Sequence, residues 1–248
     1  MTEKFSHNGF TLAEVLITLG IIGVVAAITL PTLIQNHQKQ VYVSGLQKAL
    51  NTTENMFKKM QADEEAADLG STEFFTKGVC HSTTSNWSTE CSDGYGDVEV
   101  YDRIIPKYLK VVKIGKVADS KIKYKRNYLN PYGKPEYLKT NKIDEVNGAG
   151  SGKLRIFYTT DGMIFYITPY YDCSYNSVSS RYDIWQGLIR FSVDVNGEKG
   201  PNELGRDLFE FSFDANGKLD TKARYIAWCD YNPEFTERII KNGWKMDY

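Results

Sequence analysis

A basic excess is the first thing that this 248-residue chain lacks. Its 30 lysine and arginine residues stand against 31 aspartate and glutamate residues, which leaves a formal net charge of −1. A nucleic-acid-binding surface needs clustered positive charge to neutralise phosphates, so no nucleic-acid partner is expected. Histidine is scarce too, at three residues, and none accompanies a nucleophile in a recognisable pattern for general acid–base chemistry. We therefore expect no enzyme.

Cysteine is limited to four residues, Cys80, Cys91, Cys173 and Cys229, and no Cys-x-x-Cys pair occurs among them. A structural zinc site needs four ligands at regular spacing, so His81 beside Cys80 does not indicate zinc. An even cysteine count outside the cytoplasm instead predicts two disulfides. Their pairing cannot be deduced from sequence alone, but proximity along the chain favours Cys80–Cys91 and Cys173–Cys229.

An ordinary secretory signal is also missing. Such a signal is cut after its apolar region, at small residues, whereas the apolar run of this chain passes straight through Val24–Ala27 to Leu30. The segment Phe10–Ile34 is long enough, at about 1.5 Å per helical residue, to cross a hydrocarbon core of about 30 Å. Hydropathy alone therefore indicates an N-terminal membrane anchor.

A single carboxylate accompanies this apolar run. Glu14 lies immediately before Val15–Leu30, which contains no charged side chain. An ionised side chain at membrane depth costs about 2.5–3.5 kcal/mol even on the lenient insertion scale. Glu14 must therefore be compensated by a partner or serve a purpose.

The chain reads GFTLAEVL from Gly9 to Leu16, which closely resembles the cleavage and methylation motif of type IV prepilins and type II secretion pseudopilins. The resemblance implies a leader of residues 1–9, removed by prepilin peptidase between Gly9 and Phe10, and N-methylation of Phe10. It also implies a single-pass protein of the bacterial inner membrane that joins copies of itself or related pilins in a periplasmic or extracellular filament. The leader contains only one basic residue, Lys4, so its positive-inside signal is thin.

The motif suggests what compensates Glu14. Cleavage after Gly9 creates a positive amine on Phe10, one helical turn from Glu14. In a filament, Glu14 of an incoming subunit would pair with the Phe10 amine of a neighbour, and the apolar surroundings would make a mismatched register costly. The alternative is that Glu14 only satisfies the N-terminus of its own helix, where acidic residues are favoured.

The apolar helix of residues 10–34 is expected to continue as an amphipathic helix over residues 35–70. Small residues at Gly20 and Gly23 favour close helix packing in membranes, and Pro31 is expected to kink or loosen the helix. Beyond the polar exit, apolar residues recur at helical spacing and predict one buried face. These residues are Val41, Leu46, Leu50, Phe57 and Met60. Gly70 is the expected end of the helix.

Residues 71–248 are expected to form an extracytoplasmic α+β domain. A short helix is predicted within Tyr101–Lys113, with a break at Pro106, and residues 114–152 are predicted to be mainly surface connection. Two apolar runs flank Asp161-Gly162, a strong signal for a β-hairpin. Further strands are expected at Leu188–Val195 and Leu208–Phe213. The predicted fold is a long N-terminal helix packed on an antiparallel sheet of about four strands.

A possible calcium loop joins the last two of these strands. Oxygen-bearing side chains alternate with glycines between Asp194 and Asp207, and calcium requires several oxygen ligands on a bent backbone. The glycine spacing excludes an EF-hand, and the loop loosely resembles calcium-bearing C-terminal loops of some pseudopilins. The candidate ligands are Asp194, Asn196, Glu198, Asn202 and Asp207. A long polar hairpin loop is the alternative, and no other cofactor is expected.

Two functions agree with these features. The first is a structural subunit, a pilin or pseudopilin of a type IV pilus or type II secretion filament. The second is a minor tip subunit that acts as an adhesive or ligand-binding module on a prepilin anchor.

Overall fold

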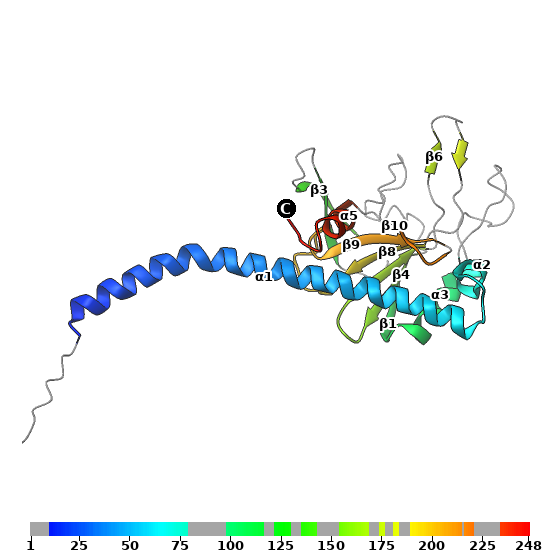
Figure 1. The fold of residues 1–248 in the computed structure, drawn as a ribbon, viewed down its shortest axis with the longest axis horizontal. Helices are drawn as coiled ribbons and strands as arrows, with labels where there is room; N and C mark the ends of the chain where they lie inside the picture. The colour runs from blue at the N-terminus through cyan, green and yellow to red at the C-terminus, as the bar shows by residue number, and fades with distance from the viewer. Residues whose placement is uncertain are drawn as a thin grey trace, which may run out of the picture. The chain divides into compact units, whose positions relative to one another are not determined.

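The computed structural model of the chain describes ten ranges of residues. They are 10–78, 98–116, 122–129, 135–142, 154–168, 174–176, 181–183, 189–214, 216–220 and 234–248. The chain divides into two compact units, Met1–Val41 and Tyr42–Tyr248, and helix α1 (Leu12–Asp63) runs through the boundary between them (Figure 1). We refer to the second unit as the head.

Pro31 lies inside helix α1, which continues past the proline to Asp63. The helix ends earlier than Gly70 because of the backbone after Asp63. Glu65 has a positive φ of 49°, and Ala66 N donates to Gln61 O at 3.0 Å. A left-handed residue with such a bond closes a helix. A 3-10 helix, η1 (Leu69–Ser71), follows.

Among the described residues of the head there are three shorter helices: α2 (Glu73–Gly78), α3 (Val98–Tyr108) and α5 (Glu234–Lys241). The helix predicted within Tyr101–Lys113 is present, but its predicted bounds were wrong at both ends. Pro106 lies inside α3, and the helix ends at Tyr108 because strand β1 (Val111–Lys116) begins shortly after it. The valines of β1 favour a strand, and pairing with β4 overrides the helical spacing.

The main sheet is antiparallel and has six strands rather than about four, in the order β1-β4-β5-β8-β9-β10. The four expected strands occupy its centre, which confirms the predicted fold class. They are β4 (Arg155–Thr159), β5 (Ile164–Thr168), β8 (Ile189–Asp194) and β9 (Leu208–Phe213). Strand β1 and the two-residue β10 (Leu219–Asp220) form the edges.

In the part of the chain that the structure describes, two further pairs of strands lie outside the main sheet: β2 (Lys123–Leu129) with β3 (Pro135–Lys142), and β6 (Ser174–Asn176) with β7 (Arg181–Asp183). The prediction that residues 114–152 are mainly surface connection was therefore wrong. Strand β2 is tied to the predicted calcium loop by two backbone bonds. Lys125 N donates to Asn202 O at 2.8 Å, and Leu204 N donates to Lys125 O at 2.9 Å.

The part of α1 in the head lies across one face of the main sheet (Figure 1). Four of the five residues predicted to form its buried face are buried: Leu46, Leu50, Phe57 and Met60. Val41 was predicted wrongly: it is 52 % exposed and lies directly before the head. Gly45 allows a close approach to the strand side, since a Cβ there would lie 2.7 Å from Val195 Cβ.

The opposite face of the sheet carries a second, smaller core. Tyr124 of β2, Tyr166 of β5 and Phe235 of α5 are buried there with five aliphatic residues. These aliphatic residues are Leu154, Ile156, Ile164, Leu204 and Leu208. The sheet is thus covered on both faces, and the loop between β8 and β9 lies at the edge of this second core.

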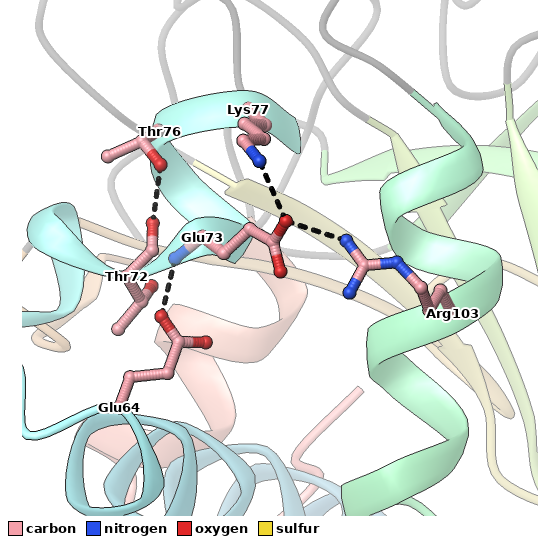
Figure 2. A network of polar contacts seen from close by, with 6 residues as sticks. All are labelled: Glu64, Thr72, Glu73, Thr76, Lys77 and Arg103. Atoms are coloured by element: carbon pink, nitrogen blue, oxygen red, sulfur yellow. Dashed lines mark hydrogen bonds and ion pairs between the residues drawn. The ribbon is translucent and has the colours of Figure 1, made fainter.

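A network of polar contacts joins the end of α1 to α2 and α3 (Figure 2). Glu64 accepts a hydrogen bond from Glu73 N at 2.6 Å, which satisfies a free amide at the start of α2. The Glu73 carboxylate in turn accepts from Arg103 of α3 at 2.7 Å and from Lys77 at 3.0 Å. These contacts, chiefly the bond from Arg103, lower the pKa of Glu73 from 4.5 to about 2.

This lowered pKa predicts an acid-dependent contribution to stability. A carboxylate with a depressed folded-state pKa stabilises the fold above its ordinary pKa, and loses that contribution as the pH falls through the folded-state value. We expect Glu73→Gln to lower the melting temperature slightly at neutral pH, and the difference from the wild type to vanish between pH 4.5 and about 2. Melting curves across this range test it, with Glu54→Gln on α1 as the control. A difference that does not change with pH would contradict the assignment.

Candidate functional site

The described part of the chain begins at Phe10, directly after the predicted cleavage point. Helix α1 starts at Leu12, and its first turn is closed by a reciprocal pair of side chains. Thr11 N and Thr11 Oγ1 both donate to Glu14 Oε2 at 2.7 Å, while Glu14 N donates to Thr11 Oγ1 at 3.3 Å. This is a capping box, in which an N-cap threonine and a glutamate three residues later satisfy each other's backbone amides.

The capping box shows where Glu14 is held in a single chain. Its carboxylate accepts hydrogen bonds from Thr11 at the N-terminus of its own helix, an interaction that the second alternative of the sequence analysis includes. The pairing of Glu14 with a neighbour's Phe10 amine stays a prediction, because it requires a second subunit. Thr11 was missed by the sequence reasoning, although the Thr-x-x-Glu spacing is itself a signal for a capping box.

The apolar surface of α1 is uncovered in the single chain. Leu16, Ile22 and Leu33 are each more than 60 % exposed, and Phe10, just before the helix, is 89 % exposed. By length and composition, α1 qualifies as a helix able to cross a membrane. A contiguous apolar surface of this kind requires lipid or other protein to cover it. A Cβ at Gly20 or Gly23 would meet nothing within 4 Å, so both sites remain open to approach by another helix.

Several predicted site residues lie outside the described residues. Gly9 belongs to the predicted leader, residues 1–9, and the four cysteines fall within 79–97, 169–173 and 221–233. Cleavage after Gly9 and the disulfides Cys80–Cys91 and Cys173–Cys229 therefore stay predictions.

The predicted calcium loop connects β8 to β9 and has a fully buried carboxylate at each end. Asp194 Oδ1 accepts from Asn196 N at 3.1 Å, and Asp194 Oδ2 accepts from Tyr124 Oη at 2.8 Å. The two oxygens of Asp207 accept from Asn202 N at 2.7 Å and from Glu203 N at 2.6 Å. Asp194 and Asp207 are each 0 % exposed.

The two carboxylates also influence each other. Burial, followed by the nearby charge of Asp207, raises the pKa of Asp194 to about 8. Burial likewise raises the pKa of Asp207, although the backbone amides of Glu203 and Asn202 oppose it. A like charge in a desolvated site disfavours ionisation. The surroundings therefore favour the protonated, uncharged form of these two carboxyl groups.

The five candidate calcium ligands do not lie in equivalent positions. The amide oxygens of Asn196 and Asn202 are buried and have no hydrogen-bond partner, whereas Glu198 is exposed. Within the described residues, no group of three or more histidine, cysteine, aspartate and glutamate side chains is placed to hold a metal ion. A cation in this loop would therefore depend on amide oxygens as well as on the carboxylates.

The backbone of the loop depends on residues that tolerate a positive φ. Gly197, Asn202 and Gly205 have φ values of 70°, 52° and 83°. Gly205 is also restricted by space, since a Cβ there would lie 2.3 Å from the Phe235 ring. These residues bend the chain so that Asp194 and Asp207 enter the same end of the second core.

Comparison with protein-family models identifies the N-terminal segment. Residues 4–30 match the model of the prokaryotic N-terminal methylation motif. No curated protein and no solved structure matches the chain. The match includes Gly9, Phe10 and Glu14 and stops before the head begins.

Proposed function

We propose that this chain, which its N-terminal methylation motif marks as a member of the type IV prepilin and pseudopilin family, is a structural subunit of a type IV pilus or a type II secretion filament. Prepilin peptidase would cut between Gly9 and Phe10 and methylate Phe10. The family is typically structural rather than catalytic, and the proposed role is assembly.

The observation that carries this proposal is the combination of the motif with an uncovered apolar helix. Residues 12–34 of α1 expose their aliphatic side chains, while the same helix buries Leu46, Phe57 and Met60 in the head. The first part of α1 thus has an apolar surface that a membrane or other subunits can cover. The second part of the same helix contributes residues to the core of the head. A plain membrane anchor requires neither the motif nor this continuity.

An exposed apolar segment at one end of α1 is consistent with movement of the subunit from the membrane into a filament. Before assembly, lipid would cover the apolar segment. In a filament, the corresponding segments of other subunits would cover it, with Gly20 and Gly23 allowing close packing. The head would face outward from the filament core.

The experiment that tests this function is N-terminal mass spectrometry of the mature protein, together with electron microscopy of sheared filaments. We expect N-methylated Phe10 as the first residue and the subunit within the filaments. A different mature N-terminus would overturn the proposal. A correctly processed protein that is scarce in the filaments and dispensable for their growth would instead support the minor tip subunit.

A further inference from the structure

Strand β1 forms one edge of the main sheet (Figure 1). Its inner side pairs with β4, from Val111 opposite Thr159 to Lys116 opposite Arg155. Among the described residues, no strand pairs with its outer side. The free side of an edge strand presents backbone N–H and C=O groups that can pair with another chain.

The exposed apolar side chains of the head belong to this same strand. Val112 is 64 % exposed and Ile114 is 39 % exposed, and no other large apolar side chain in the described part of the head is exposed to this degree. A shift of register between Val111 and Lys113 leaves Val112 outside the pairing with β4. Single exposed apolar residues scattered over a surface are normal, but these two lie together on a free edge.

The charge along this edge has one sign. The segment from Lys107 to Lys116 reads KYLKVVKIGK, with four lysines and no acidic residue. Lys110, Lys113 and Lys116 are exposed. A partner that covers the two aliphatic side chains therefore also meets these lysines, so a partner with acidic residues fits the edge.

Lys116 has a like charge as its neighbour on the inner side. It lies opposite Arg155 of β4, and Arg155 Nε pairs with Asp102 at 3.0 Å. Like charges directly opposite each other in an antiparallel pair are unfavourable. Asp102 compensates Arg155, and an acidic residue on the outer side of β1 would compensate Lys116 in the same way.

The lysines of β1 lie on both faces of the sheet. Lys113 is opposite Tyr158 in the pairing and its Nζ lies 5.1 Å from the centre of the Tyr158 ring. Lys116 is three residues further along the strand, and side chains alternate between the two faces, so it lies on the face of Ile114. A strand added to this edge would thus meet a lysine on either face.

We propose that the outer edge of β1 binds an extended segment of another protein in which acidic and apolar residues alternate, and that this segment extends the main sheet by one strand. Pairing of the two backbones would supply affinity, and the side chains would supply specificity, as in other cases of strand addition. The proposal goes beyond the filament role and does not depend on it.

The same features disfavour two other occupants. A second copy of β1 would bring lysine against lysine, which is a common protection of edge strands against self-association. Nucleic acid would contact the lysines through its phosphates. It has no strand backbone to pair with the edge, however, and it would leave Val112 and Ile114 exposed.

A fluorescently labelled peptide of alternating glutamate and valine, about eight residues long, tests the proposal on the full-length protein in detergent. Fluorescence anisotropy should show saturable binding with a dissociation constant of about 10–100 μM, and added salt should weaken it by screening the lysines. A peptide with lysine in place of glutamate should not bind. A glutamate–valine peptide with a central proline, which interrupts strand pairing, should not bind either.

Three results would overturn the proposal. The first is no binding of the glutamate–valine peptide at about 1 mM, well above the expected dissociation constant. The second is equal binding of the peptide with proline, because charge alone would then explain the contact. The third is tighter binding of a single-stranded oligonucleotide of equal charge, which would assign the surface to nucleic acid.

Two variants locate the binding edge. Lys116→Glu places an acid opposite Arg155, so it should keep the fold and weaken binding of the glutamate–valine peptide at least about tenfold. Val112→Thr keeps a β-branched residue that suits a strand and removes exposed apolar surface, so it should weaken binding by a smaller factor.

Lys218→Glu is the matched control. Lys218 is exposed directly before β10, at the opposite edge of the same sheet, and this variant should bind the peptide like the wild type. Melting curves of all three variants confirm that the head is folded. Wild-type binding by Lys116→Glu, or an equal loss of binding in Lys218→Glu, would contradict the assignment to β1.

Discussion

Replacing Glu14 with alanine should leave cleavage after Gly9 intact and remove the subunit from filaments. The cleaved bond lies five residues before Glu14, so the peptide bond itself is unchanged. What the variant loses is the only carboxylate near the new amine of Phe10. An uncompensated charge at membrane depth costs about 2.5–3.5 kcal/mol, which corresponds to a loss of incorporation of roughly a hundredfold.

Because of the capping box, Glu14→Ala alone cannot separate the loss of the charge from the loss of the helix cap. Glu14 already accepts two bonds from Thr11 at 2.7 Å, so Glu14→Ala removes both a helix cap and a charge. Glu14→Gln separates the two roles, because an amide oxygen still accepts from Thr11 but has no charge. If pairing with a neighbour's amine drives assembly, both variants are excluded from filaments.

The readout is the ratio of filament-incorporated to membrane-retained subunit, with mass spectrometry of the N-terminus to confirm processing. Thr11→Ser, which keeps a hydroxyl for the cap, is the control and should assemble normally. Wild-type incorporation of Glu14→Gln would assign Glu14 to its own helix and refute the intersubunit pairing. Wild-type incorporation of Glu14→Ala would remove Glu14 from assembly altogether.

The sequence predicted the elements whose apolar pattern is strong. The helical repeat from Leu46 to Met60 corresponds to the buried face of α1. The alternation in Ile189–Asp194 and Leu208–Phe213 predicted the two strands correctly, although both faces of each strand are buried. The fold class follows from these elements. Strand β1 was missed because its lysines and its exposed Val112 obscure any alternation. An edge strand has little burial to impose a pattern, and its pairing with β4 is a long-range contact that no local signal contains.

The candidate sites divide in the same way. Gly9, Phe10 and Glu14 could be predicted because they are close together in one fixed register, which a sequence records directly, and the family model matches the segment that contains them. The candidate ligands of the loop between β8 and β9 were predicted only as a set of oxygen-bearing residues, and they stay a prediction. That Asp194 is buried against Tyr124 while Glu198 faces solvent depends on strand β2, which is far away along the chain and was not predicted.

A second large effect is expected in the head, where Phe57 of α1 is central to the main core. Its side chain is 2 % exposed. Its ring lies within 5.2–6.1 Å, centroid to centroid, of four other phenylalanine rings. These belong to Phe74 and Phe75 of α2, Phe191 of β8 and Phe213 of β9. One side chain thus joins the long helix to α2 and to the centre of the sheet.

Phe57→Ala should therefore destabilise the head by about 3–5 kcal/mol, the usual cost of removing a buried phenylalanine and leaving a cavity. For a domain of this size that corresponds to a fall in melting temperature of roughly 6–20 °C. Phe57→Leu, which keeps most of the volume, should cost less than half as much. Chemical denaturation and melting of the full-length protein in detergent measure both.

Phe10→Ala is the matched control, because it makes the same change just before the same helix, at a side chain that is 89 % exposed. It should leave the melting temperature of the head unchanged. A loss below about 1 kcal/mol in Phe57→Ala would show that the core closes around the cavity, in contrast to the usual result for well-packed interiors. Because Phe57 is far from the cleavage motif along the chain, Phe57→Ala should still be processed after Gly9. A subunit that is processed but has an unstable head would show that processing depends on the N-terminal segment, independently of the folded head.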